Sequence, residues 1–249
     1  MDLKPYFSII IPAYNESKRL PLTLIDVDRH MQNAPFDYEI IVVDNNSKDA
    51  TKEIALRFSS IIKNLKVLEC RTQGKGAAVK VGMEQSKGKI RLFLDADNSV
   101  SVDQFFKMKH FFEEGYDVVI ASRNVQGSKT EPPQPWYRFL MGILGNIFIR
   151  TIILGGIKDT QCGFKAFSER AASKIFPLSD INGWGFDVEI LSLAKDMGFK
   201  IKEAPVLWVN SLGSKIGPGA YFQVFFDTIK IKLRMIAKYY LKKSSKMRV

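Results

Sequence analysis

The sequence lacks the short motifs of the commonest nucleotide-binding folds, because it has neither a G-x-G-x-x-G fingerprint nor a Walker A loop. Its 2 cysteines, Cys70 and Cys162, make no metal-ligand spacing and no disulfide framework. A cysteine metal cluster and a disulfide-stapled fold are therefore excluded, and a reducing cytoplasmic setting is expected. No internal repeat or low-complexity tract is present.

Hydrophobic runs long enough to cross a membrane are also missing. The most apolar segment, 136–157, contains Arg138 and Arg150, which leave only eleven uncharged residues between them. A spanning helix needs about 20 apolar residues, so this segment should lie in a membrane interface, as two helices or as one amphipathic helix anchored by Trp136 and Tyr137. The apolar run 7–11 is too short for a signal peptide and is better explained as a strand.

Acidic residues are outnumbered, with 26 Asp and Glu against 37 Lys and Arg, and the formal net charge is +11. The excess is concentrated after Tyr221, where Asp227 is the one acid among eight basic residues: Lys230, Lys232, Arg234, Lys238, Lys242, Lys243, Lys246 and Arg248. Such a tail indicates an anionic partner, either a membrane surface or nucleic acid. Lys230, Arg234, Lys238 and Lys242 recur at steps of four and share one helix face. The apolar residues gather on another side of the helix: Phe222, Phe225, Phe226, Ile229, Leu233 and Ile236. For 222–236, the alternative is an ordinary helix that covers the core.

Strands and helices alternate along the first half of the chain. Apolar or β-branched runs predict strands at 7–11, 38–43, 66–70, 90–94 and 118–121. Helical patterns begin near Pro21, cover 51–62, follow Gly76, and open at 101–104 with a capping-box pattern. This order predicts βαβ units and a mostly parallel α/β sheet flanked by helices. With 249 residues, 46% of them hydrophobic, the chain can form one large domain or a domain with an appendage.

Polar residues follow several predicted strands at what should be one edge of the sheet. Asp95-Ala96-Asp97 ends the strand at 90–94, and two carboxylates there suit Mg²⁺ or Mn²⁺ carrying a diphosphate, although a solvated loop is the plainer explanation. Gly74-Lys75-Gly76 opens a helix whose N-terminus favours an anion, or it is only a tight turn.

Together these motifs resemble the family-2 glycosyltransferases of the GT-A fold. The shared order is Pro12-Ala13-Tyr14-Asn15-Glu16, Val43-Asp44-Asn45, Gly74-Lys75-Gly76 and Asp95-Ala96-Asp97. Within that family, three later stretches (156–165, 184–189 and 213–215) resemble the dolichyl-phosphate β-glucosyltransferases, with polyprenyl-phosphate mannose synthases further off. The resemblance covers roughly residues 7 to 216 and implies a GT-A, Rossmann-like sheet.

The resemblance also implies roles for individual residues. Asp95 and Asp97 would hold the metal, and Asp44 would accept a hydrogen bond from the uracil. The nucleotide-sugar pocket would be lined by Pro12, Tyr14, Glu16, Asp44, Lys75, Asp95 and Ala96. Core packing for Tyr14 and helix capping for Glu16 are the structural alternatives.

On the acceptor side, arginine forks match phosphate geometry, and the resemblance implies that Arg123 and Arg138 hold the lipid phosphate, with Lys215 as a third positive charge. Asp159 would be a catalytic residue, but a phosphate acceptor with a second pKa of about 6 needs no strong base, so an orienting role is open. Trp184 and Asp187 would serve the sugar and its loop, while Glu189 would brace the loop.

These inferences predict a metal-dependent, inverting hexosyltransferase that moves glucose from UDP-glucose to a polyprenyl phosphate, dolichyl or undecaprenyl. A GDP-mannose enzyme and a non-catalytic basic protein that binds membrane or nucleic acid are the alternatives; carboxylates at the sheet edge argue against nucleic acid. We expect a catalytic domain over 1–216, including the interfacial segment 136–157, and a basic amphipathic helical region over 217–249. The protein should sit peripherally on the cytoplasmic face of a membrane.

Overall fold

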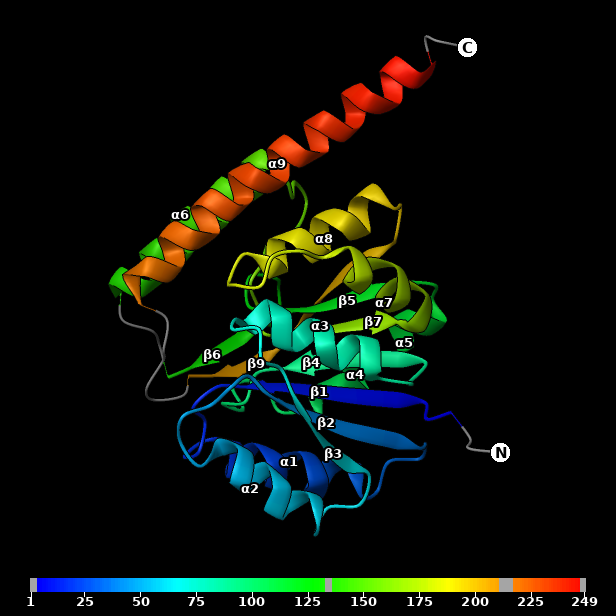
Figure 1. The fold of residues 1–249 in the computed structure, drawn as a ribbon, viewed down its shortest axis with the longest axis vertical. Helices are drawn as coiled ribbons and strands as arrows, with labels where there is room; N and C mark the ends of the chain where they lie inside the picture. Colours follow the sequence, from blue (N-terminus) through cyan, green and yellow to red (C-terminus); the bar gives the residue numbers. More distant parts are fainter. Residues whose placement is uncertain (1–3, 133–135, 211–216, 247–249) are drawn as a thin grey trace.

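Nine strands form a seven-stranded and a two-stranded sheet in the described part of the chain. The computed structural model describes residues 4–132, 136–210 and 217–246, without the side chains of 136–141, 218 and 238–246. The strands are β1 Phe7–Ala13, β2 Tyr38–Asp44, β3 Leu65–Glu69, β4 Ile90–Leu94, β5 Val118–Ser122, β6 Lys129–Glu131, β7 Phe164–Ser168, β8 Ile201–Pro205 and β9 Leu207–Val209. The large sheet has the order β3-β2-β1-β4-β7-β5-β8 and is parallel except for β7 (Figure 1). The predicted mostly parallel sheet is confirmed.

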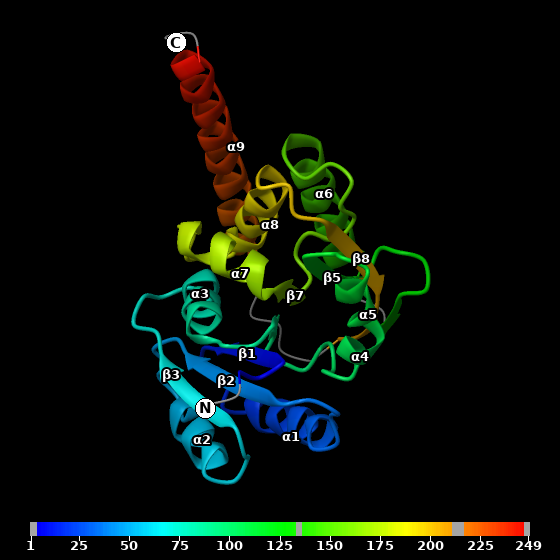
Figure 2. The same cartoon turned by 90° about the vertical axis from the view of Figure 1, so that its right-hand side faces the viewer.

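Helices cover both faces of this sheet. They are α1 Leu20–Met31, α2 Thr51–Ser59, α3 Lys75–Gln85, α4 Gln104–Met108, α5 His110–Glu113, α6 Trp136–Ile152, α7 Glu169–Ile175, the 3₁₀ turn η1 Phe176–Leu178, α8 Phe186–Asp196 and α9 Pro218–Lys246. Helices α1 and α2 lie on one face, and α3, α7 and α8 on the other (Figure 2). All residues of β1, β4 and β5 are buried, as expected for apolar strands covered on both sides.

The carboxyl ends of β1, β2 and β4 meet at one edge because these strands are parallel. Strand β1 lies between β2 and β4, so the strand order reverses there: β2 and β3 lie on one side of β1, and β4 and the later strands lie on the other. Ligands of open α/β sheets bind at the carboxyl ends of the strands where the order reverses. The antiparallel β7 begins at this same edge, just after Gly163. The backbone N–H of Asp95 donates to the Gly163 carbonyl at 3.1 Å, which ties β7 to the end of β4.

One local prediction is wrong. The hydroxyl of Ser101 does not cap a helix; it donates to Asp26 of α1 at 2.7 Å. Helix α4 begins later, at Gln104, and its N-cap residue Asp103 makes no side-chain capping bond. A tertiary contact therefore outcompetes the local capping pattern.

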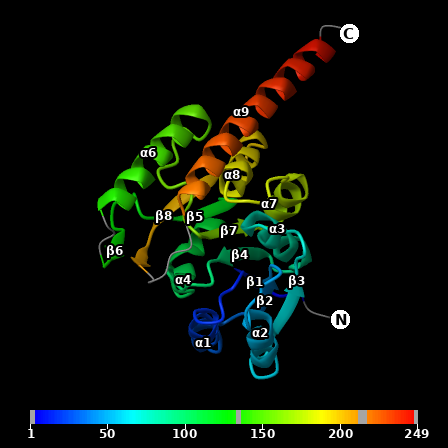
Figure 3. The same ribbon diagram turned by 60° about the vertical axis from the view of Figure 1, so that its left-hand side comes forward.

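Helices α6 and α9 lie side by side along one flank of the molecule (Figure 3), where the rings of Phe148 and Phe225 stack with centroids 4.7 Å apart. Segment 136–152 forms a single helix, so the one-helix alternative holds there. In the described residues, no helix combines the length and apolarity required to cross a membrane.

Helix α9 buries one face and exposes another. Val224, Thr228 and Ile231 are buried, so this face covers the rest of the protein. The aromatic and aliphatic side chains predicted to gather on another side do so and are exposed. Together with α6 they form an apolar surface: Ile143, Leu144, Ile147, Phe222, Phe225, Phe226, Ile229, Leu233 and Ile236.

Candidate active site

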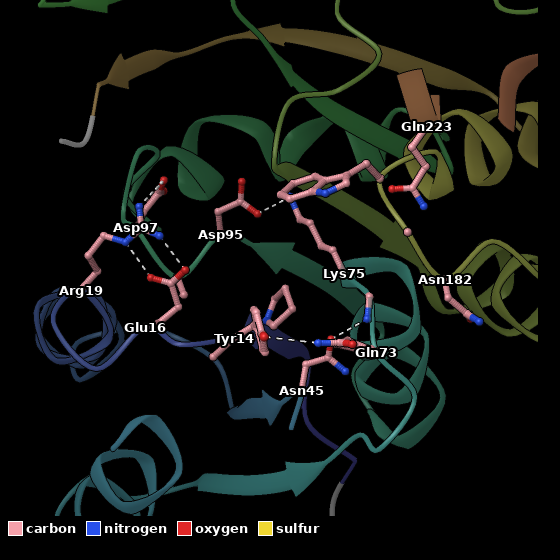
Figure 4. A pocket seen from close by; sticks show the side chains of 17 residues that line it. Tyr14, Glu16, Arg19, Asn45, Gln73, Lys75, Asp95, Asp97, Asn182 and Gln223 are labelled. Atoms are coloured by element: carbon pink, nitrogen blue, oxygen red, sulfur yellow. Dashed lines mark hydrogen bonds and ion pairs between the residues drawn. The ribbon is translucent and has the colours of Figure 1, made fainter. Parts of the chain in front are cut away.

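A cavity of about 580 Å³ opens at the sheet edge where β1, β2 and β4 end (Figure 4). It collects seven of the predicted nucleotide and metal residues and the predicted sugar residue Trp184. The lining consists of Pro12, Ala13, Tyr14, Glu16, Arg19, Asn45, Gln73, Gly74, Lys75, Ala78, Asp95, Ala96, Asp97, Asn182, Gly183, Trp184 and Gln223. The motifs that sequence reasoning assigned to one edge thus share one cavity.

Asn45 connects the loops that form the floor of the cavity. Its backbone N–H donates to Ala13 at 2.8 Å, its amide nitrogen donates to the Thr72 carbonyl at 2.6 Å, and its amide oxygen accepts from Gly74 at 2.7 Å. Gly74 has a φ of +130°, and a Cβ there would lie 2.1 Å from the Asn182 carbonyl oxygen. The glycine before Lys75 is therefore required both by backbone conformation and by close approach to the loop at Asn182.

Lys75 and Asp95 form the charged centre of the cavity. The Lys75 ammonium lies 2.5 Å from Asp95 Oδ1 and 5.7 Å from the ring centroid of Trp184. Burial disfavours the ammonium, but attraction to Asp95 and Asp187 outweighs burial and raises the pKa of Lys75. Burial also raises the pKa of Asp95, opposed by Lys75 and reinforced by Asp97. Lys75 therefore stays charged at the centre of the cavity, held by the carboxylates around it.

Asp97 faces the other side of the cavity. Its Oδ1 accepts the Ser99 backbone N–H at 3.1 Å, and its Oδ2 lies 3.7 Å from a guanidinium nitrogen of Arg19. Arg19 is held in turn by both carboxylate oxygens of Glu16, each at 2.6 Å. Glu16 therefore lines the cavity and also orients Arg19 within it. Its side chain binds this arginine rather than capping the next helix.

The two carboxylates fit a divalent metal as a partial ligand set. Asp95 and Asp97 both line the cavity, and hard carboxylate oxygens suit Mg²⁺ and Mn²⁺. Within the described ranges, no three His, Cys, Asp or Glu side chains converge on one point as metal ligands. Among the described residues, Asp95 and Asp97 would supply carboxylate ligands, and a substrate diphosphate with water would complete the shell, as magnesium sites commonly do.

Asp44 lies just behind the cavity rather than in its lining. It is buried at the end of β2, and its Oδ2 accepts the Ser47 backbone N–H at 3.3 Å. Its Oδ1 has no hydrogen-bond partner among the described residues. An unsatisfied buried carboxylate oxygen is costly, so a ligand N–H that reached it would gain a charge-assisted bond.

Arg123 and Asp159 form one ion pair outside the cavity lining. Arg123 donates from Nε at 2.7 Å and from Nη2 at 2.9 Å to the two Asp159 oxygens, and its guanidinium lies 4.7 Å from the Trp208 ring centroid. Burial opposes ionisation of Asp159, but Arg123 outweighs burial and lowers its pKa. Asp159 is thus a buried ion-pair partner with little basicity.

The remaining predicted residues occupy three different environments. Asp187 pairs with Lys165, and both side chains are buried behind the cavity. Glu189 braces the loop as expected, because one oxygen accepts the backbone N–H groups of Asp180 and Ile181 at 2.9 and 2.8 Å. Arg138 begins α6 but its side chain is outside the described residues, as is the whole of Lys215.

Sequence reasoning missed four polar side chains of the cavity, which belong to Arg19, Gln73, Asn182 and Gln223. Arg19 follows the Asn15-Glu16 motif at helix spacing, which is a usable signal. Nothing local marks Asn182 or Gln223, since they reach the cavity from the loop before α8 and from α9.

The architecture of the large sheet matches that of solved structures. Glucosyl-3-phosphoglycerate synthase from Mycobacterium tuberculosis, crystallised with Mn²⁺, UDP and glucosyl-3-phosphoglycerate, superposes with a TM-score of 0.67 at 17% identity, covering 91% of this chain and 80% of that one. The large sheet and its flanking helices therefore have the GT-A glycosyltransferase fold.

The sequence comparison is more specific. A profile described as Glycosyl transferase family 2 matches residues 8–176, and the chain belongs to this family. It is 37% identical over 247 residues to dolichyl-phosphate beta-glucosyltransferase of Dictyostelium discoideum, covering 93% of this chain and 75% of that protein. It is 30% identical to the human protein of the same name, with 92% and 75% covered.

Proposed function

We propose that this glycosyltransferase moves glucose from UDP-glucose to dolichyl phosphate, or a related polyprenyl phosphate, with inversion at C1. The observation that carries the proposal is the cavity that joins Lys75, Asp95 and Asp97 beside the unsatisfied oxygen of Asp44. The relatives named as dolichyl-phosphate beta-glucosyltransferases support the acceptor and the sugar, since they match more than nine tenths of the chain.

In this proposal the donor lies along the cavity in three parts. The nucleoside occupies the end formed by Tyr14, Asn45 and Gln73, where its base N–H reaches toward Asp44. The diphosphate lies against Lys75, with Asp95 and Asp97 on its other side. Lys75 supplies positive charge to the leaving group, and a divalent cation bound by Asp95 and Asp97 would neutralise the rest of that charge as a Lewis acid.

The transfer step needs little proton chemistry from the protein. A phosphate oxygen of the acceptor forms the new bond to C1, and the bond from C1 to the UDP oxygen breaks with its electron pair leaving on the diphosphate. The acceptor phosphate is already ionised, with a second pKa of about 6. Asp159 would therefore orient Arg123 rather than remove a proton, and Arg123, with Arg138 and Lys215, would attract the lipid phosphate.

A lipid acceptor requires access to a membrane, and the apolar surface of α6 and α9 offers it. Its side chains are exposed, and the same end of the chain carries the basic residues counted above. Apolar insertion together with attraction to anionic lipids holds amphipathic helices in a membrane interface. We therefore propose peripheral attachment at the cytoplasmic face, with 1–216 as the catalytic domain and 217–249 as a basic helical region.

The test is a transfer assay with the full chain, radiolabelled sugar nucleotides and dolichyl phosphate in detergent micelles. UDP-glucose with Mn²⁺ or Mg²⁺ should yield a glucolipid, and EDTA should abolish it. Asp97→Asn should lower turnover by about a hundredfold or more while the protein stays folded, because metal stabilisation of the leaving charge is worth several kcal/mol. Transfer from GDP-mannose in preference to UDP-glucose would contradict the proposed donor, and undiminished turnover in EDTA would contradict the metal.

A further inference from the structure

One wall of the cavity comes from the C-terminal helix. Gln223 of α9 lines the cavity next to Asn182, Gly183 and Trp184, the loop that precedes α8 (Figure 4). In the proposed arrangement the nucleoside lies against Tyr14, Asn45 and Gln73, and the diphosphate lies among Lys75, Asp95 and Asp97. The glucosyl unit then faces the wall formed by this loop and by Gln223, so the following inference rests on the proposed function.

Gln223 and Gly183 fit closely against each other. A Cβ added at Gly183 would lie 1.9 Å from Gln223 Nε2 and 3.0 Å from Oε1, so the amide lies directly against the backbone of this loop. A glutamine amide offers two N–H donors and an acceptor oxygen, and sugar hydroxyls both donate and accept. Gln223 thus brings to this wall the hydrogen-bonding groups that a sugar needs.

The same side of α9 also holds the loop in place. Asp227, one turn beyond Gln223, packs against the Gly185 backbone, where an added Cβ would come within 2.4 Å of its side chain. Arg234, two turns further, lies 3.2 Å from Glu189, the residue that braces the start of the loop. Steps of four and seven residues place these three side chains along one helix face.

A neighbouring side of α9, opposite its buried face, contributes Phe222, Phe226 and Leu233 to the exposed apolar surface. One helix therefore joins the proposed lipid-facing surface to the wall of the donor cavity. We infer that Gln223 hydrogen-bonds hydroxyl groups of the glucosyl unit and is a specificity-determining residue of the donor site. The C-terminal helix is then part of the donor site rather than an appendage used only for attachment.

The inference is tested by calorimetric titration of the full chain, with Mn²⁺ present, using UDP-glucose and UDP as separate ligands. Gln223→Met keeps the volume of the side chain and removes its amide, and Gln223→Ala removes both. Each variant should bind UDP within about twofold of wild type and UDP-glucose about three- to tenfold more weakly, the loss expected for neutral hydrogen bonds.

Gln73→Ala is the matched control. Gln73 is also a cavity glutamine, but its amide lies 3.3 Å from the Tyr14 hydroxyl at the nucleoside end. This variant should weaken UDP and UDP-glucose to the same extent. Equal loss of both ligands in the Gln223 variants, or no loss of either, would overturn the sugar contact. Failure of the wild-type protein to bind either ligand would instead refute the proposed function.

Discussion

Lys75 is the residue whose removal should weaken donor binding most directly. Its ammonium lies 2.5 Å from Asp95 at the centre of the cavity, and attraction to Asp95 and Asp187 keeps it charged. In Lys75→Met the side chain keeps much of its length and loses its charge. A diphosphate entering the variant would meet Asp95 and Asp97 without the ammonium group that offsets their negative charge.

The size of the effect follows from the contact that is lost. Hydrogen bonds to charged groups contribute about 1.5–3 kcal/mol, so UDP should bind about 10- to 150-fold more weakly. Folding should suffer less than the 3–5 kcal/mol that breaking a fixed buried ion pair costs, because Asp95 already has a raised pKa and can take up a proton.

The raised pKa of Asp95 determines how the stability of Lys75→Met should change with pH. An aspartate whose pKa is higher in the folded than in the unfolded protein stabilises the fold most at a pH below its ordinary pKa of 3.8. This stabilisation disappears as the pH rises through the pKa of the folded state. Removing Lys75 raises the pKa of Asp95 further. The free energy of unfolding of Lys75→Met should therefore fall, relative to wild type, as the pH rises above the ordinary aspartate pKa of 3.8.

The assays are titration calorimetry with UDP at fixed Mn²⁺ and denaturant unfolding at a series of pH values. Lys80→Met is the control, because Lys80 lies on the same helix and donates to the Ser179 carbonyl at 2.8 Å, outside the cavity lining. Unchanged UDP affinity in Lys75→Met, or equal losses in both variants, would show that Lys75 does not bind the diphosphate.

Two further predictions concern the acceptor side and the membrane. Asp159→Asn should destabilise the fold by at most about 3–5 kcal/mol, because it leaves the partly buried Arg123 charge without its partner. Because the pKa of Asp159 is lowered in the folded protein, the ion pair stabilises the fold above about pH 4, and this stabilisation is lost as the pH falls. In denaturant unfolding, the free energy of unfolding of the variant should therefore fall less steeply at acid pH than that of wild type. A fully stable but inactive variant would support a catalytic base instead. Phe226→Ser should weaken flotation with anionic liposomes about tenfold or more, from the loss of one inserted aromatic side chain, whereas Leu22→Ser, at an exposed position on α1, should not. Equal binding by both variants would remove the apolar surface from membrane attachment.

The first half of the fold was predictable because short, contiguous stretches of sequence mark its strands and the polar motifs that follow them. Strands β1, β2 and β4 are apolar runs that end in polar motifs, and parallel pairing alone brings those ends together. Strand β7 escaped prediction because Lys165 interrupts its apolar pattern. That lysine is fully buried only because Asp187 pairs with it from another element.

The candidate site likewise contains residues that short motifs predicted and residues that only the packing of distant segments brings in. Tyr14, Lys75, Asp95 and Asp97 stand in short motifs, and the structure places all four around one cavity. Gln223 arrives there only through the docking of α9. The pairing of Arg123 with Asp159 likewise joins residues on different segments, so the sequence suggested two separate roles where the structure has one ion pair.

The position of β7 has a consequence for how the chain matures during synthesis. Strand β7 separates β4 from β5, although both precede it in the sequence. While the chain emerges from the ribosome, β1 to β4 can pair, but β5 has no neighbour in the sheet until β7 follows. Asp95 also rests against Gly163, which arrives just before β7. The nascent chain therefore carries an incomplete cavity with an open edge at β4, and a pause in translation between residues 122 and 164 would expose that edge to aggregation.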